Sequence, residues 1–215
     1  MRTQQIEFWS GDFGRDYTLR NTVGHETWTH QYLDKYGVSK LEMNNEFLGN
    51  LPKDMRILEV GCNTGQQLEA LCRQGFRSLY GIELQRCAVG YAKSRFEDLT
   101  ILQGSGFEIP FKTEIFDLVF TSGVLIHIAP PDLPIVMREF YRCSSQYIWG
   151  LEYYAESMVE VRYRGNTGVL WKGDFASIFL RSFPDLTLIK KRFYPYVNDH
   201  ERGNLDCMYL LKKGA

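Results

Sequence analysis

The chain has 215 residues, of which 44% are hydrophobic and 24% charged, the balance typical of a soluble globular protein. Its 25 basic and 26 acidic side chains give a net charge of -1, which argues against a protein that coats nucleic acid by bulk charge. No run of 18 apolar residues is present and the first residues lead into no apolar stretch. We therefore expect neither a membrane span nor a secretory signal.

The cysteine and histidine spacings argue against a metal site. The five cysteines are odd in number and form no C-x-x-C pair, so neither structural zinc nor a disulfide framework is expected. The four histidines show no H-E-x-x-H spacing. We expect no bound metal and reduced thiols in a cytoplasmic protein.

Predicted elements alternate between strands and helices through the middle of the chain. Residues 1–54 are polar and aromatic, and two helices are expected there. The strands that follow are expected at 56–60, 78–83, 100–104, 116–121 and 146–150, and the helices at 66–73, 86–96 and 132–143. This alternation predicts βαβ units, a parallel sheet and right-handed crossovers.

The last part of the chain changes character. A helix is expected at 174–181, followed by strands at 186–189 and 207–211. The last two strands can form an antiparallel pair at the edge of the sheet, an arrangement that is common on otherwise parallel sheets.

A glycine-rich turn ends the first strand. The turn at 61–65 reads G-C-N-T-G and precedes a helix, so its amides are placed to meet polar or anionic groups. Glu83 ends the second strand, 22 residues after Gly61, where an acidic side chain can accept hydrogen bonds from a ribose diol. The spacing departs from the dinucleotide pattern G-x-G-x-x-G, which disfavours a nicotinamide dehydrogenase.

Several motifs resemble those of the class I S-adenosylmethionine-dependent methyltransferases. Residues 59–65 resemble motif I, E/D-x-G-x-G-x-G, with Asn63 in place of the middle glycine. Residues 103–111 resemble the adenine loop, with Ser105 in place of the usual aspartate. Residues 116–128 resemble the motif F-D-x-V-x-x-x-x-V-L-x-H that follows strand four of the family.

This resemblance covers residues 56–150 and implies a fold. The expected architecture is Rossmann-like α/β, with a mostly parallel seven-stranded sheet, one antiparallel edge strand, helices on both faces and an N-terminal helical cap. The resemblance implies a cap at 1–54 and a methyltransferase domain at 55–215, with an acceptor-binding insertion at 151–193. It also implies S-adenosyl-L-methionine as the methyl donor and S-adenosyl-L-homocysteine as the product.

The resemblance also implies a donor site at the strand ends. Its expected residues are Glu59, Gly61, Cys62, Asn63, Gly65, Glu83, Leu84, Ser105, Gly106, Phe107, Ser122 and Gly123.

Residues 8–21 resemble the start of the pseudaminic acid biosynthesis-associated methylases, which reads F-W-x-G-x-F-G-x-x-Y-x-x-R-N. This resemblance places Tyr17, Arg20 and Asn21 at the donor. An arginine suits the carboxylate of the donor, and aromatic faces attract its sulfonium. The alternative is an N-terminal arm that packs its aromatic side chains on the core.

Two residues are candidates for catalysis. His127 lies beyond the strand at 116–121 and can take a proton from a hydroxyl or ammonium acceptor, or it can pack and hydrogen-bond to backbone. Glu152 follows the strand at 146–150 and can orient an amine or hydroxyl, or it can cap the next helix.

Residues 160–193 carry seven basic and three acidic side chains with interleaved aromatic residues. Such a surface can bind an acidic sugar, a nucleotide-linked sugar or RNA, or it can be a solvated face over core aromatics. We expect methyl transfer to an oxygen or nitrogen of a small acidic acceptor, such as a nucleotide-activated sugar of the pseudaminic acid pathway. An RNA or protein methyltransferase and a non-catalytic donor-binding protein are the alternatives.

Overall fold

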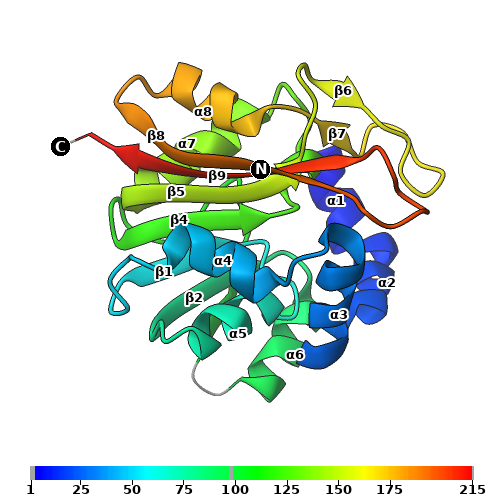
Figure 1. The fold of residues 1–215 in the computed structure, drawn as a ribbon, viewed down its shortest axis with the longest axis horizontal. Helices are drawn as coiled ribbons and strands as arrows, with labels where there is room; N and C mark the ends of the chain where they lie inside the picture. Colours follow the sequence, from blue (N-terminus) through cyan, green and yellow to red (C-terminus); the bar gives the residue numbers. More distant parts are fainter. Residues whose placement is uncertain (1–2, 97–98, 215) are drawn as a thin grey trace. The chain divides into compact units, whose positions relative to one another are not determined.

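The computed structural model describes residues 3–96 and 99–214, and the chain divides into two compact units, Met1–Pro110 and Phe111–Ala215. Figure 1 shows the course of the chain through both. Among the described residues, no helix is long and apolar enough to cross a membrane. Across those same ranges, no group of three or more His, Cys, Asp or Glu side chains is arranged to hold a metal ion.

The first unit begins with helices and continues with alternating strands and helices. Its elements are α1 (Gln4–Ser10), α2 (Asp12–Asn21), α3 (His25–Tyr36), α4 (Lys40–Leu48), β1 (Arg56–Val60), α5 (Gln66–Arg73), β2 (Ser78–Glu83), α6 (Arg86–Arg95) and β3 (Thr100–Gln103). The strands follow the order β3-β2-β1 and are parallel, with Leu58 opposite Tyr80 and Tyr80 opposite Thr100.

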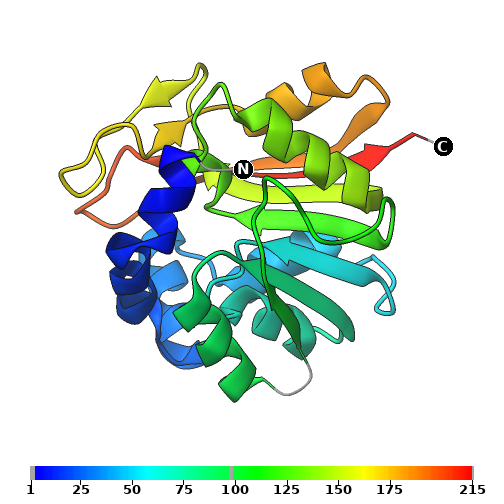
Figure 2. The same ribbon diagram turned by 180° about the vertical axis from the view of Figure 1, so that it is seen from behind.

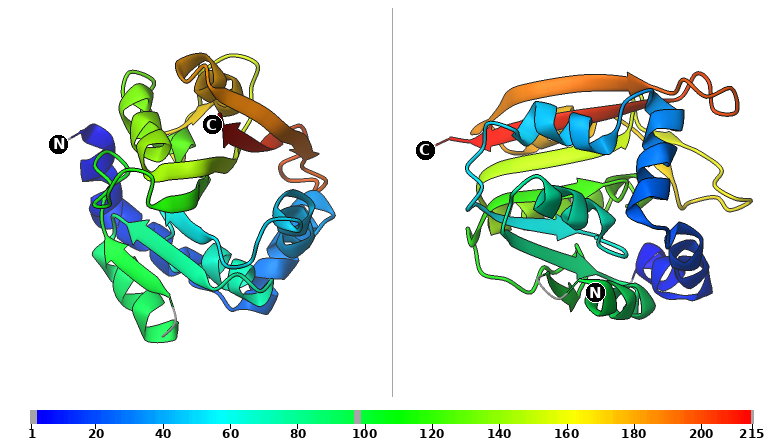
Figure 3. Two further views of the ribbon diagram at one scale, coloured as in Figure 1. Left: turned by 90° about the vertical axis from the view of Figure 1, so that its left-hand side faces the viewer. Right: turned by 60° about the horizontal axis from the view of Figure 1, so that its bottom comes forward.

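The expectation of two helices in residues 1–54 is wrong, because four are present. Gly11 is extended and separates α1 from α2, and Gly37 ends α3 in the left-handed conformation at φ 69°. Ser39 and Glu42 then form a capping box that starts α4. Figure 3 shows α1 and α2 together at one end of this row of helices and α4 at the other.

The helices of the first unit bury their apolar faces against its strands. Leu68 and Leu71 of α5 are fully buried, as are Ala88 and Ala92 of α6. Gly65, the last residue of the glycine turn, has the left-handed conformation at φ 80° and is the N-cap of α5. The turn is therefore attached to a helix that is anchored in the core, and this anchoring fixes its position at the end of β1.

The second unit contains four of the predicted strands, and its C-terminal part is longer than expected. Its elements are β4 (Phe116–Ser122), a 3-10 turn η1 (Leu125–His127), α7 (Leu133–Cys143), β5 (Ser144–Tyr153), β6 (Val159–Glu160), β7 (Trp171–Lys172), α8 (Phe175–Ser182), β8 (Leu186–Pro195) and β9 (Leu205–Lys213). β4 and β5 are parallel, and Figure 2 shows α7 lying across them.

β8 and β9 form the predicted antiparallel pair, and each is longer than expected. β9 lies between β5 and β8 and runs antiparallel to both. The predicted fold class, a mostly parallel seven-stranded α/β architecture, is confirmed. The division at residue 54 into a cap and a methyltransferase domain stays a prediction.

Candidate functional site

The glycine turn after β1 has three residues in the left-handed region. Gly61, Asn63 and Gly65 have φ values of 75°, 45° and 80°. Asparagine is among the side chains that tolerate this conformation best, so Asn63 can replace a glycine here. The backbone N–H groups of Gly61 and Cys62 donate to the carbonyl of Ile82, at 2.8 and 3.1 Å. The turn is therefore held against the end of β2.

Glu83 links the turn to β2. Its carboxylate accepts hydrogen bonds from the backbone N–H of Asn63 at 2.8 Å and of Gln85 at 2.7 Å. Burial raises the pKa of Glu83, and these hydrogen bonds act in the opposite direction. Each carboxylate oxygen can accept a further hydrogen bond, and the side chain is only partly buried. Glu83 thus keeps acceptor capacity where a ribose diol was expected.

Two buried oxygens close to the turn have no hydrogen-bond partner, Glu59 Oε2 and Thr64 Oγ1. Burial raises the pKa of Glu59 to about 8, and the nearby ammonium of Lys40 opposes that shift. Cys62 is also buried, and a methyl group added at Gly81 would lie 2.6 Å from its Sγ. The thiol therefore packs against β2, and the two buried oxygens are left without a partner among the residues that the structure describes.

The adenine-loop residues form a tight turn after β3. Gly104 donates its N–H to the carbonyl of Glu83 at 3.0 Å. The Ser105 hydroxyl oxygen accepts the N–H of Phe107 at 3.2 Å, and the Phe107 ring is buried. Gln103 donates its side-chain amide to the carbonyl of Leu84 at 3.2 Å. The expected residues Leu84, Ser105, Gly106 and Phe107 therefore lie on segments bonded to the end of β2.

The aromatic residues of the N-terminal segment pack on one another. The Tyr17 ring meets Trp9 edge to face at 5.2 Å between centroids, and Trp9 meets Phe13 in the same way at 5.4 Å. The Arg20 guanidinium lies 6.0 Å from the Phe13 ring centre, and Asn21 donates its amide to the carbonyl of Tyr17 at 2.8 Å. Donor contacts of Tyr17, Arg20 and Asn21 stay predictions.

Two residues outside the expected set connect this segment to the turn. Thr18 donates its hydroxyl to Asn63 Oδ1 at 3.2 Å, and Gln85 donates its amide to the carbonyls of Trp9 and Gly11 at 3.2 and 2.9 Å. No motif marks Thr18 or Gln85. The one feature of the sequence that could have indicated a role for Gln85 is its position, two residues after Glu83 at the end of the second strand.

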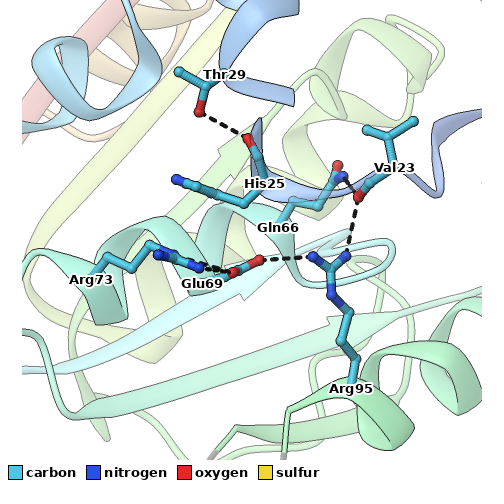
Figure 4. A network of polar contacts seen from close by, with 7 residues as sticks. All are labelled: Val23, His25, Thr29, Gln66, Glu69, Arg73 and Arg95. Carbon is cyan, nitrogen blue, oxygen red and sulfur yellow. Dashed lines mark hydrogen bonds and ion pairs between the residues drawn. The ribbon is translucent and has the colours of Figure 1, made fainter. Parts of the chain in front are cut away.

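A polar network fixes the start of α5, as Figure 4 shows. The carbonyl of Val23 accepts hydrogen bonds from Gln66 at 2.9 Å and from Arg95 at 3.1 Å. Arg95 also pairs with Glu69 at 3.3 Å, and Glu69 pairs with Arg73 at 2.8 Å. The network ties the segment between α2 and α3 to α5 and α6. The helix that follows the glycine turn is thereby joined to the N-terminal helices.

In the second unit, Glu152 caps the turn η1. Its carboxylate accepts the backbone N–H groups of Val124, Leu125 and Ile126 at 3.2 to 3.3 Å. Burial raises the pKa of Glu152 to about 8, and these bonds oppose the shift. The element capped is a turn before Glu152 in the chain, not the following helix. Ser122 ends β4 and Gly123 follows it before η1, and a role for them at the donor stays a prediction.

His127 is buried at the end of η1. Its Nδ1 lies 2.8 Å from the carbonyl of Val169, which can only accept, so Nδ1 carries the proton. Burial lowers the pKa of His127 to about 4, so the ring is neutral at neutral pH. The ring centre lies 5.5 Å from that of Tyr163. The backbone bond expected under the packing alternative is present, and a role as general base stays a prediction.

The basic aromatic region divides into a buried and an exposed part. Trp171, Phe175 and Phe179 belong to the core. Arg162 and Arg164 are exposed on a hairpin closed by reciprocal 2.9 Å hydrogen bonds between the backbones of Tyr163 and Asn166. The expected interleaving of basic and aromatic side chains on one surface therefore holds only for part of this region.

Comparisons with known proteins find similarity to the middle of the chain. Residues 58–146 match a family model described as a methyltransferase domain. An uncharacterized methyltransferase of Synechocystis sp. is 30% identical over 128 residues, covering 54% of this chain and 60% of the relative. An uncharacterized Haemophilus influenzae protein is 22% identical over 126 residues, covering 53% and 50%. The matches thus span 60% or less of these relatives' lengths.

Solved structures match between 77% and 99% of the chain. Magnesium protoporphyrin IX methyltransferase from Synechocystis, solved with bound SAM, has a TM-score of 0.69 at 15% identity, covering 99% of both chains. A putative Haloferax volcanii methyltransferase in complex with the activator Trm112 has a TM-score of 0.70 at 14% identity, covering 99% and 98%. A Methanosarcina mazei SAM-dependent methyltransferase has a TM-score of 0.65 at 14% identity, covering 77% and 95%. The chain has the SAM-dependent methyltransferase fold.

Proposed function

We propose that the protein is an S-adenosylmethionine-dependent methyltransferase that methylates an oxygen or nitrogen of a small anionic acceptor. A nucleotide-activated sugar of the pseudaminic acid pathway is the acceptor class that the N-terminal segment favours. The observation that carries the donor assignment is the position of Glu83, which ends β2 and is bonded to the N–H of Asn63 in the glycine turn. The five free cysteines support a reducing, cytoplasmic location.

The residues of the first unit fit this donor. Glu83 would accept hydrogen bonds from its ribose, and the buried, unpartnered Oε2 of Glu59 would gain a partner from its ammonium. Leu84 and Phe107 would supply apolar contacts beside the base. The bound donor supplies a methyl group on an already reactive sulfonium.

The protein's own contribution is to bind and orient. Methyl transfer requires the acceptor atom to lie about 3–3.5 Å from the methyl carbon, in line with the leaving sulfur. A rigid donor site favours this alignment, and the hydrogen bonds of Glu83 and the network at Arg95 hold the first unit rigid. A base is required only for an acceptor that is protonated at the working pH. His127, with its proton on Nδ1, would offer Nε2 for that role.

An anionic acceptor is supported by two exposed arginines that neighbour Tyr163 in the chain's second unit. Arg162 and Arg164 flank Tyr163, whose ring lies beside the His127 imidazole. Guanidinium groups bind carboxylates and phosphates through paired hydrogen bonds. Acidic sugars and their nucleotide conjugates carry one or both of these groups.

The donor assignment is tested by calorimetric titration of S-adenosylmethionine and S-adenosylhomocysteine. We expect both to bind the wild type, and Glu83→Ala to weaken binding at least about tenfold. Asp54→Ala, which removes an exposed carboxylate before the start of β1, is the matched control and should bind as the wild type does. A folded wild type that binds neither ligand would contradict the proposal.

The acceptor is tested by transfer of a labelled methyl group. We expect product with nucleotide-activated nonulosonates and none with total RNA or a protein lysate as substrate. Label in RNA or protein with no label in any sugar would overturn the acceptor class and leave the donor assignment standing.

A further inference from the structure

The side chain of Gln85, two residues after the end of β2, bonds to the N-terminal helices. Gln85 Nε2 donates to two carbonyls at the junction of α1 and α2, those of Trp9 and Gly11. The Trp9 carbonyl is among the last of α1, a position where helices lack internal partners. The Gln85 Oε1 accepts the thiol of Cys87 at 3.6 Å. Both polar atoms of this buried amide are therefore engaged.

The backbone of the same residue is bonded to Glu83. The N–H of Gln85 donates to Glu83 Oε1 at 2.7 Å, and the other oxygen of Glu83 accepts the N–H of Asn63. Asn63 in turn accepts the hydroxyl of Thr18 from α2. Gln85 thus connects the carboxylate to the junction of α1 and α2, and Asn63 connects it to the middle of α2.

Gly14 makes room for this contact. A methyl group added at Gly14 would lie 1.8 Å from the Trp9 carbonyl oxygen and 3.1 Å from Gln85 Nε2. A side chain there would force α2 away from α1 and toward the amide. The absence of a side chain at residue 14 is therefore required for α1, α2 and Gln85 to meet as they do.

We propose that Gln85 is a positioning residue that couples docking of α1 and α2 to donor binding at Glu83. This inference rests on the proposed function for the identity of the donor. Ligand binding at Glu83 and docking of the two helices stabilise the same conformation of the loop at 83–85, so each favours the other. Without the side-chain amide, the coupling is weaker, because the path through Asn63 and Thr18 remains.

The test compares Gln85→Ala with Gln74→Ala, which removes an amide-to-carbonyl bond of 2.9 Å to Leu41 elsewhere in the first unit. Donor affinity is measured by calorimetry with S-adenosylhomocysteine. Docking is measured by the rate of trypsin cleavage after Arg15, an exposed residue of α2 outside the expected donor contacts. In the wild type and in Gln74→Ala, we expect saturating ligand to slow cleavage. In Gln85→Ala, we expect faster cleavage, little protection by ligand and about tenfold weaker binding.

A purely structural role for Gln85 would lower stability but leave the protection by ligand unchanged. Gly14→Ala tests the coupling from the helix side, because it displaces α2 without replacing any residue of the loop that carries Glu83. We expect the same loss of ligand protection in this variant. Wild-type affinity and wild-type protection in folded Gln85→Ala would overturn the inference. Failure of the wild type to bind ligand would instead overturn the proposed function, and the cleavage rates without ligand would still report whether Gln85 holds the helices.

Discussion

Thr18 in α2 donates a hydrogen bond of 3.2 Å to the side-chain oxygen of Asn63, the residue of the glycine turn where the family motif has its middle glycine. Asn63 therefore has two functions: its backbone adopts the left-handed conformation at φ 45°, and its side chain binds the N-terminal helices. A glycine would serve only the first.

Asn63→Gly is expected to relax the backbone and to weaken donor binding, because the contact with Thr18 is lost. Thr18→Val removes the same hydrogen bond from the other side. Calorimetric donor affinities of the two single variants and the double variant form a cycle, and we expect the second substitution to have little further effect. Fully additive losses would show that the two side chains act independently.

Because two buried carboxyl groups have raised pKa values, we predict that the free energy of unfolding falls as the pH rises through neutrality. The pKa values of Glu59 and Glu152 are both raised to about 8 in the folded protein, above the ordinary value of 4.5. Between those values, the folded chain binds a proton at each site that the unfolded chain does not. The free energy of unfolding should then fall by about 1.4 kcal/mol per pH unit for each group.

Urea unfolding of Glu59→Gln and Glu152→Gln at pH 6.8 and 7.8 measures this effect. Each variant should show a smaller decline than the wild type over that interval. An unchanged slope in Glu59→Gln would mean that this carboxylate is ionised in the folded protein, and Asp54→Ala serves as the exposed control.

His127 has the opposite effect at lower pH. Its pKa is lowered from 6.5 to about 4, so the unfolded chain binds the additional proton between these values and stability rises with pH there. The imidazole carbon-bound proton shifts of His127, assigned with His127→Gln, should stay constant in NMR spectra from pH 5.5 to 8. A titration midpoint near 6.5 would show that the imidazole is not buried in solution, because burial is what lowers its pKa.

Gly150 in β5 is expected to be intolerant of a side chain. A methyl group there would lie 2.4 Å from the Cζ and hydroxyl oxygen of Tyr209. Gly150→Ala should cost about 1–3 kcal/mol in urea unfolding, and replacing Tyr209 with Leu in the same chain should recover part of that loss. Gly90→Ala is the control, since no atom lies within 4 Å of the added carbon.

The sequence predicted the strands of the first unit almost residue by residue, because each is a short apolar run bounded by glycine or polar residues. The N-terminal helices were harder to predict. α2 and α3 are polar around much of their circumference, so helical periodicity is weak, and the breaks between helices depend on the conformation of single glycines.

The candidate site was predictable where a motif fixes the backbone, as at Gly61, Gly65 and Glu83. Gln85 and Thr18 were not, because their partners lie 74 to 76 and 45 residues away and the contacts follow no period. Prediction from the sequence was also limited for His127 and Glu152. Their residue types suit proton transfer, but the sequence does not reveal that backbone groups engage both.

The position of β9 between β5 and β8 has a consequence for how the second unit folds. β5 ends at Tyr153, and its antiparallel partner begins only at Leu205. Pairing across such a sequence separation slows folding, since a long loop must close before the contact is gained. During synthesis, β5 has an open edge until β9 emerges, and β8 lacks its partner strand until the same moment. A chain cut before residue 205 is therefore expected to aggregate through these edges rather than fold as a smaller domain.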